Sequence, residues 1–106
     1  MKYRIRLANV FKVASKLIAN GELKYSCNAV SGAVVRICIK NNVPSAHICK
    51  IQNAVMEEYR RMGCEDSAAF NIDKLEDPKA FRVMWLDFAY HSCKDQNYRI
   101  WVNCND

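Results

Sequence analysis

The spacing of apolar and polar residues predicts a helix at the start of the chain. From Tyr3 to Asn20, apolar residues recur at alternating steps of four and three, which places them on one face of a helix. Asn20-Gly21 is a typical sequence for a helix end. The predicted apolar stripe consists of Tyr3, Leu7, Val10, Phe11, Ala14, Leu17 and Ile18.

A second element is expected to begin at Ser26 or Asn28, either of which could cap it, and to end near Lys40. The pattern favours a helix. A buried strand over residues 33–39 is the alternative, because β-branched residues cluster there. On the helical reading, the inner face consists of Val30, Ala33, Val34, Ile37 and Cys38.

The third predicted helix has clear signals at both ends. Pro44 suits a first helical turn because its φ is already fixed and it lacks the N–H that would have no partner there. Arg60 and Arg61 complement the helix dipole in the last turn, and Gly63 marks the end. The inner stripe is predicted to be Ile48, Ile51, Val55, Tyr59 and Met62.

The fourth predicted helix begins at Asp77-Pro78 and ends near Cys93, after a short turn and loop over residues 65–76. Its inward residues are predicted to be Phe81, Met84, Trp85 and Phe88.

The tail alternates large apolar residues with others, which predicts a short strand or turn near residues 98–102. We therefore expect a mainly α fold: one compact domain over residues 1–106, built as a bundle of about four helices. The alternative is an α+β fold with a small sheet made of residues 33–39 and 98–102.

Composition supports one globular core. The chain has 106 residues, of which 51% are hydrophobic, and only 3 Gly and 2 Pro. No apolar run approaches the roughly 18 residues that span a membrane, so we expect no membrane partner. Lys12 and Lys16 interrupt the apolar stretch that a secretory signal would need.

The six cysteines include no Cys-x-x-Cys pair, and we expect reduced thiols in the cytoplasm. Two His-x-Cys tripeptides leave zinc binding as an alternative, because two imidazoles and two thiolates could complete a tetrahedral site. The candidate ligands would be His47, Cys49, His91 and Cys93. Residues two apart on a helix point about 200° away from each other, so we predict no metal site.

Charge is distributed unevenly along the chain. Residues 1–62 contain 11 Lys and Arg against 3 Asp and Glu, whereas residues 63–106 contain 5 against 8. The basic part could pack against the acidic stretch from Glu65 to Asp77, or it could bind an anionic partner. The predicted basic binding residues are Lys2, Arg4, Arg6, Lys12, Lys16 and Arg36.

The aromatic residues lie mostly elsewhere: seven of the eleven follow residue 65. Basic residues without interleaved aromatic groups are a weak indication of nucleic-acid binding, which therefore remains an alternative. Tyr90 and Trp101 fit the helical stripe less well than the others and are candidate interface residues, which a homo-oligomer could also use.

The common catalytic signatures are missing. Glycine occurs only at positions 21, 32 and 63, which excludes a glycine-rich phosphate loop, and no Gly-x-Ser-x-Gly or His-Glu-x-x-His sequence is present. We predict a protein that is not an enzyme and uses no cofactor.

Three segments resemble small bacteriophage-encoded proteins that have no assigned activity. They are Lys16-Leu17-Ile18, the stretch Ser26-Cys27-Asn28-Ala29-Val30, and the late Phe/Trp-rich helix followed by Tyr98-Arg99. The resemblance implies a phage or mobile-element origin and supplies no catalytic residues.

Such an origin implies a non-enzymatic protein that antagonises a host factor by stoichiometric binding in the bacterial cytoplasm. It would inhibit a protein effector of host defence or sequester a signalling nucleotide. The expected partner is a host protein with an acidic surface or an anionic nucleotide. The alternatives are a small basic nucleic-acid-binding protein and a zinc or thiol protein.

Overall fold

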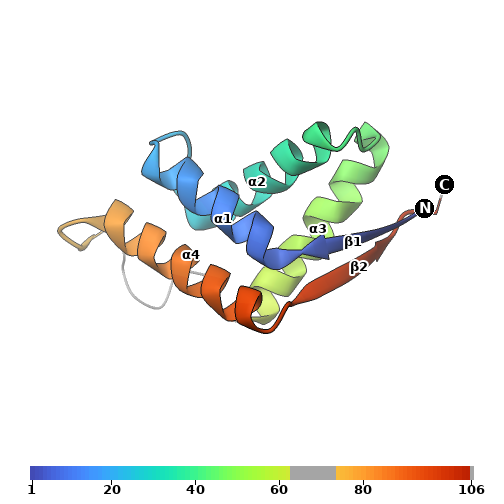
Figure 1. The fold of residues 1–106 in the computed structure, drawn as a ribbon. Coiled ribbons are helices and arrows are strands. Elements are labelled where there is room, and N and C mark those ends of the chain that lie inside the picture. Colours follow the sequence, from blue (N-terminus) through green and yellow to red (C-terminus); the bar gives the residue numbers. More distant parts are fainter. Residues whose placement is uncertain (63–73, 106) are drawn as a thin grey trace.

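The chain begins and ends in β-strands and has helices between them (Figure 1). The computed structural model describes residues 1–62 and 74–105. In order, the elements are β1 (Lys2–Arg6), α1 (Leu7–Ala19), α2 (Ser26–Lys40), α3 (Ser45–Arg61), α4 (Pro78–Asp95) and β2 (Arg99–Asn103). The predicted mainly helical fold with a short strand near residues 98–102 is confirmed.

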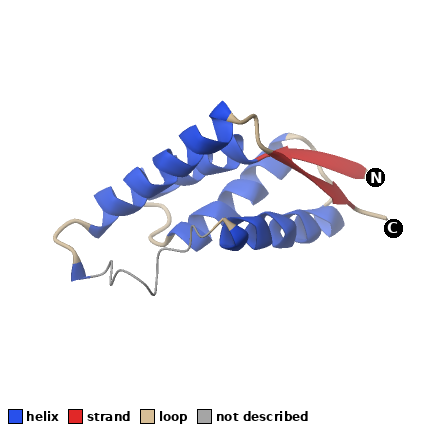
Figure 2. Ribbon diagram, turned by 90° about the horizontal axis from the view of Figure 1, so that it is seen from below, coloured by secondary structure: helices blue, strands red, loops and turns tan. Residues whose placement is uncertain are grey.

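The two strands form an antiparallel ribbon that joins the two ends of the chain. Tyr3 pairs with Val102 and Ile5 with Ile100. Beyond the strand ends, the Cys104 N–H donates to the Met1 carbonyl at 2.7 Å. Both termini therefore lie together at one end of the molecule (Figures 1 and 2).

The helix predicted over Tyr3–Asn20 is wrong in its first turn, because residues 2–6 form β1 and α1 starts at Leu7. These residues alternate between charged and apolar, a period of two that suits a strand with one face against the protein. Tyr3 also fits the helical stripe that follows, so the local pattern is ambiguous. Pairing with β2 favours the strand, because it provides hydrogen-bond partners for backbone N–H and C=O groups of β1. The alternative strand over residues 33–39 is also wrong, because these residues lie inside α2.

Most other helix boundaries follow from local signals. The cap predicted at Ser26 or Asn28 is wrong, because α2 begins at Ser26 itself and Tyr25 before it forms no side-chain cap hydrogen bond. Gly21 adopts a left-handed φ of 74°, and the Glu22 N–H donates to the Leu17 carbonyl at 3.0 Å, which closes the end of α1. The Asp77 carboxylate accepts from the Ala80 N–H at 3.0 Å and caps α4. The third helix begins at Ser45, directly after Pro44. Gly63 and most of the turn and loop predicted over residues 65–76, as far as residue 73, lie outside the described residues.

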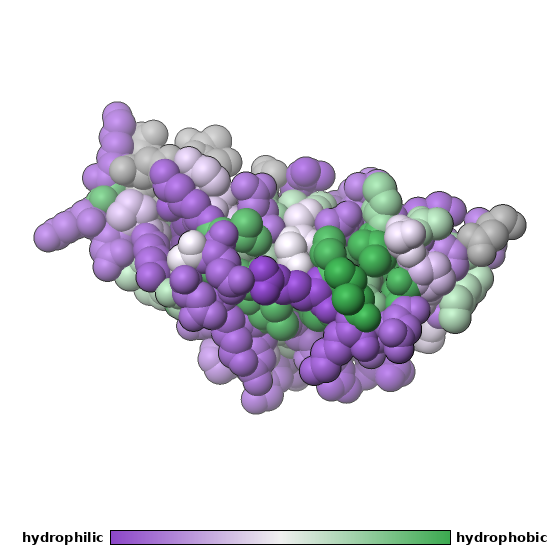
Figure 3. Space-filling view, turned by 90° about the horizontal axis from the view of Figure 1, so that it is seen from above, coloured by the Kyte–Doolittle hydropathy of each residue, from purple (hydrophilic) through white to green (hydrophobic). Residues whose placement is uncertain are grey.

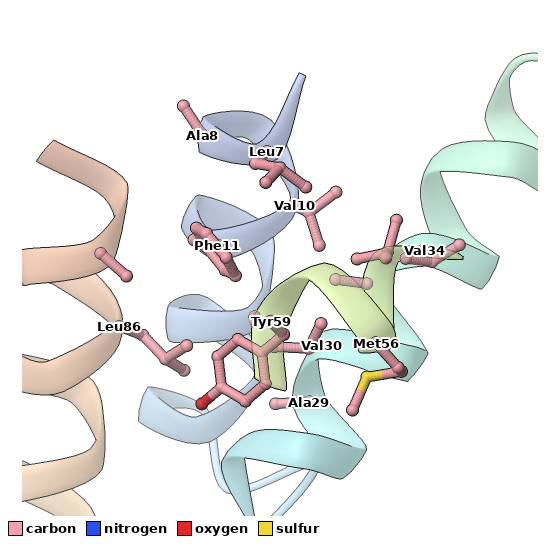
Figure 4. Packing of buried hydrophobic residues seen from close by; sticks show 14 of the residues in the cluster. Leu7, Ala8, Val10, Phe11, Ala29, Val30, Val34, Met56, Tyr59 and Leu86 are labelled. Carbon is pink, nitrogen blue, oxygen red and sulfur yellow. The ribbon is translucent and has the colours of Figure 1, made fainter. Parts of the chain in front are cut away.

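One buried cluster holds the elements together. The first helix packs between α4 and α2, α2 packs on α3, and α3 contacts β2. Phe11, Tyr59 and Leu86 meet at the centre of this cluster (Figure 4). The fully buried Tyr59 hydroxyl donates to Ser26 Oγ at 3.0 Å, so this polar group is satisfied inside the core. The stripes predicted for α1, α2 and α3 are confirmed from Leu7 onward.

The inward face predicted for α4 is wrong. Its buried residues are Arg82, Leu86, Ala89 and Cys93. Small residues at 89 and 93 let α4 approach α1, which large rings there would prevent. The predicted stripe lies to one side: Phe81, Trp85 and Phe88 stack in sequence with neighbouring ring centroids 6.3 Å apart, and Phe88 is 67% exposed.

Candidate functional site

The outer face of the β1–β2 ribbon gathers cationic side chains from both ends of the sequence. Alternation along β1 turns Tyr3 and Ile5 toward the helices and leaves the charged residues exposed. On β2, Trp101 is exposed while Val102 is buried. We call this surface the ribbon face, and it consists of Lys2, Arg4, Arg6, Arg99 and Trp101.

The strand register places the Trp101 ring among these cations. Arg4 lies directly opposite Trp101, and Arg6 lies opposite Arg99. Side chains of directly opposed residues lie on the same face and contact each other. Lys2 Nζ lies 5.6 Å from the centroid of the Trp101 ring, and this ring is 60% exposed. A large aromatic surface is thus available to a ligand between positive charges.

The inner face of the ribbon is anchored to α3. The Tyr3 hydroxyl lies 2.8 Å from Nδ1 of His47, whose side chain is 4% exposed. The two rings also meet edge to face, with centroids 5.7 Å apart. Lys50 Nζ donates to the Asn105 carbonyl at 3.4 Å just beyond β2. These contacts hold the backbone of the ribbon in place, so ligand binding has to order the exposed side chains but not the strands.

A small pocket of about 180 Å³ continues the site at the foot of the ribbon. Its wall includes Arg6, Asn9, Tyr90 and Lys94. Lys94 Nζ lies 5.7 Å from the centroid of the half-buried Tyr90 ring. Arg6 belongs both to the ribbon face and to the wall of this pocket. It therefore links two lysine–ring pairs: Lys2 with Trp101 on the ribbon, and Lys94 with Tyr90 on α4. The structure brings both predicted interface aromatics, Tyr90 and Trp101, next to this basic surface.

The structure separates the remaining predicted basic residues from the ribbon face. Lys12 and Lys16 are exposed farther along α1. Arg36, on α2, donates to the Glu22 carboxylate at 3.1 Å, so its charge is paired. Seen from above, hydrophilic residues cover much of the surface, with smaller apolar areas between them (Figure 3).

Arg99 is the cation of the ribbon face that sequence reasoning missed. The only local indication was the alternation over residues 98–102, which predicts a strand or turn. The pairing of β2 with β1 is what places Arg99 opposite Arg6. The proposed packing of the basic helices against the acidic stretch from Glu65 lies mainly outside the described residues.

The two His-x-Cys tripeptides lie within helices, and each turns its members to opposite sides. On α3, His47 is buried and Cys49 exposed, whereas on α4, His91 is exposed and Cys93 buried. Over residues 1–62 and 74–105, no three His, Cys, Asp or Glu side chains gather in a way that could hold a metal ion. Among the described cysteines, Cys38 and Cys104 are buried thiols and Cys49 is an exposed one.

Glu58 and Arg61, near the end of α3, hold Tyr98, the residue before β2. The Glu58 carboxylate accepts hydrogen bonds from Arg61 and from the Tyr98 hydroxyl. The Arg61 hydrogen bond, together with that of Tyr98 and the Arg61 charge, holds the Glu58 pKa below its ordinary value, against the opposing effect of burial. The hydrogen bond to Glu58 raises the pKa of Tyr98, because it favours the neutral phenol. This group supports the start of β2 rather than a ligand.

Within the described parts of the chain, none of the helices has the length and apolar character required to cross a membrane. Comparison of the chain with protein-family models, curated proteins and solved structures found no match. The geometry of the ribbon face is therefore the main guide to function.

Proposed function

We propose that this protein is a non-enzymatic binding protein whose ribbon face holds a phosphate-bearing ligand with a planar base. The observation that carries the proposal is the exposed Trp101 ring, which lies beside Lys2 and at the strand position opposite Arg4. Proteins commonly bind single-stranded nucleic acid through aromatic rings interspersed with cations. The bases stack on the rings and the phosphates contact the positive charges.

The charge of the ribbon supports an anionic ligand. Residues 1–6 and 98–103 contain Lys2, Arg4, Arg6 and Arg99, and no Asp or Glu. Arginine suits phosphate in particular, because its planar guanidinium can donate two parallel hydrogen bonds. The pocket at the foot of the ribbon adds Lys94 and Tyr90, so the ligand can extend beyond one nucleotide.

Two sources could supply this chemistry: a single strand of nucleic acid and a free signalling nucleotide. The ribbon extends over several residues, and Tyr90 on α4 adds a second aromatic group to Trp101, which favours a single strand of nucleic acid. In a bacterial cytoplasm, a phage-encoded protein of this kind would act by occupancy, withholding the ligand from a host factor.

Fluorescence anisotropy with labelled oligothymidylate tests the proposal. Trp101→Ala should weaken binding by roughly 5- to 150-fold, the range expected for one lost base stack. Phe88→Ala is the matched control, because it removes an equally exposed aromatic ring from α4. Arg4→Glu should also weaken binding strongly, whereas Lys79→Glu, at the start of α4, should have a much smaller effect.

Competition separates the two sources. A cyclic dinucleotide that displaces the oligonucleotide at equal or lower concentration would identify the nucleotide as the preferred ligand. Equal oligonucleotide affinity of the native protein and Trp101→Ala would contradict the proposal. Capture from bacterial lysate of an acidic protein that resists nuclease, without oligonucleotide binding, would instead support inhibition of a protein effector.

A further inference from the structure

Strand β1 has a second edge that β2 does not cover. The Met1 and Cys104 backbones exchange hydrogen bonds at 3.0 and 2.7 Å, and the Leu7 N–H donates to the Tyr98 carbonyl at 3.3 Å. In an antiparallel ladder, every second residue pair is hydrogen-bonded. Tyr3 and Ile5 thus direct their backbone groups toward β2, whereas Lys2, Arg4 and Arg6 direct theirs to the opposite edge.

A groove of about 340 Å³ runs along this opposite edge. One wall is the strand itself, from Tyr3 to Arg6, and includes residues from both of its faces. The groove therefore lies beside the strand and not over the ribbon face. The other wall consists of apolar residues from α2, from the turn after it and from α3: Ile37, Cys38, Val43 and Ile51.

We propose that this groove binds an extended acidic segment of a partner polypeptide, which joins β1 as a third, antiparallel strand. Added strands are held by backbone hydrogen bonds and selected by the pockets that receive alternate side chains. The backbone groups of Lys2, Arg4 and Arg6 supply the hydrogen bonds. The apolar wall receives every second side chain of the added strand.

The register determines which sequence fits. Residues opposite Lys2, Arg4 and Arg6 share their face and contact these cations, so Glu or Asp belongs there. The residues between them turn toward the partly exposed Ile37 and Val43, so small apolar side chains belong there. The preferred segment alternates acidic and β-branched residues.

The same charges disfavour a second copy of this chain as the occupant. Pairing β1 with another β1 would place cations opposite cations, which opposes self-association at an exposed edge. A nucleic acid has no repeating amide ladder to pair with the strand. An acidic peptide, unlike a second copy of this chain or a nucleic acid, uses both the edge and the wall.

A labelled peptide amide of sequence Glu-Val-Glu-Val-Glu tests the inference by fluorescence anisotropy. In an antiparallel pairing, the central Glu N–H points toward β1 and the neighbouring Val N–H points away. Methylation of the central Glu amide nitrogen should weaken binding by about tenfold or more, since it removes a hydrogen bond and adds a clash. Methylation of a Val amide nitrogen should have a much smaller effect.

Two variants of Arg4 test the backbone hydrogen bond between β1 and the peptide from the side of the protein. Arg4→Pro removes the N–H at the free edge without removing a bond to β2, and proline is tolerated at such positions. Arg4→Gln removes the same charge but keeps the N–H. Arg4→Pro should bind the peptide more weakly than Arg4→Gln, with circular dichroism confirming that both are folded.

The outcomes that overturn the inference are specific. Absence of binding by the unmethylated peptide would do so, as would equal affinities of the two methylated peptides. Tighter binding of the peptide methylated at Glu would overturn the antiparallel register. All these results are measured with peptides, so they are independent of whether an oligonucleotide binds to Trp101.

Discussion

Arg4 and Trp101 lie directly opposite each other across the β1–β2 ribbon, although they come from opposite ends of the chain. Arg4 is on β1 and Trp101 is on β2, so neither strand alone carries both the cation and the aromatic ring. The pairing places a guanidinium beside an exposed ring only when the first and last segments of the chain are both folded. Unfolding or removal of either strand should therefore abolish ligand binding.

Salt dependence will report how many cations of the ribbon face contact phosphates. For a single strand, each neutralised phosphate contributes about 0.7 to the slope of log K against log salt concentration. Arg99→Gln should reduce this slope by about that amount for oligothymidylate. Lys79→Gln, on α4, should leave it unchanged. An unchanged slope in Arg99→Gln would show that Arg99 makes no phosphate contact.

Truncation of two neighbouring positions on α4 should have very different effects on stability. Leu86 is fully buried, so Leu86→Ala should lower the free energy of unfolding by about 2–5 kcal/mol. Phe88→Ala should change it by roughly 0.5 kcal/mol or less, because most of that ring is exposed. Urea denaturation of both variants measures this. Similar losses would contradict the orientation of α4.

The contrast between these two positions shows why one part of the fold could be predicted and another could not. Helices α1, α2 and α3 were predictable because the spacing of their apolar residues, Gly21 and Pro44 are local signals. On α4, the prediction was wrong because it assigned the largest side chains to the buried face. Large rings suggest a core face, yet the close approach of α1 is made possible by small residues such as Ala89. Which face α4 buries depends on its neighbour.

The candidate site shows the same limit. Lys2, Arg4 and Arg6 were predicted as binding residues from charge, at the start of a segment expected to be helical. Their strand and the contributions of Arg99 and Trp101 depend on pairing between distant segments, which no local pattern specifies.

The buried hydrogen bond between Tyr59 and Ser26 can be tested with a double-mutant cycle. Tyr59→Phe should cost about 1–3 kcal/mol, because it deprives the buried Ser26 hydroxyl of its partner. Adding Ser26→Ala should then cost less than it does in the native protein. Strict additivity of the two changes in unfolding free energy would show that the bond does not contribute to stability.

Alkylation should distinguish two thiols. Cys49 is exposed, whereas Cys38 is buried, and burial together with nearby Cys104 raises the pKa of the Cys38 thiol. A raised pKa means less thiolate, which is the reactive form. Near pH 8, iodoacetamide should therefore modify Cys49 at least about tenfold faster than Cys38, as followed by peptide mass spectrometry. In urea, the two rates should converge. Equal rates in the folded protein would contradict the burial of Cys38.

The hydrogen bond from Tyr98 to Glu58 should stabilise the protein in a pH-dependent way. The Glu58 pKa is lowered in the folded protein, so its contribution is present above its ordinary value of 4.5 and is lost as the pH falls through the lowered value. The Tyr98 pKa is raised, so its contribution is lost only as the pH rises above about 10. Between these limits, Tyr98→Phe should lower the free energy of unfolding by about 1 kcal/mol, an ordinary amount for one hydrogen bond at a half-buried position.

Urea denaturation at neutral pH and in acid can measure this difference. As Glu58 takes up a proton, its acceptor becomes neutral, and the native protein and Tyr98→Phe should approach the same stability. Tyr90→Phe, which lacks a carboxylate partner among the described contacts, is the control and should show no such convergence. A difference for Tyr98→Phe that persists unchanged in acid would show that the Glu58 carboxylate is not the group that stabilises the Tyr98 hydroxyl.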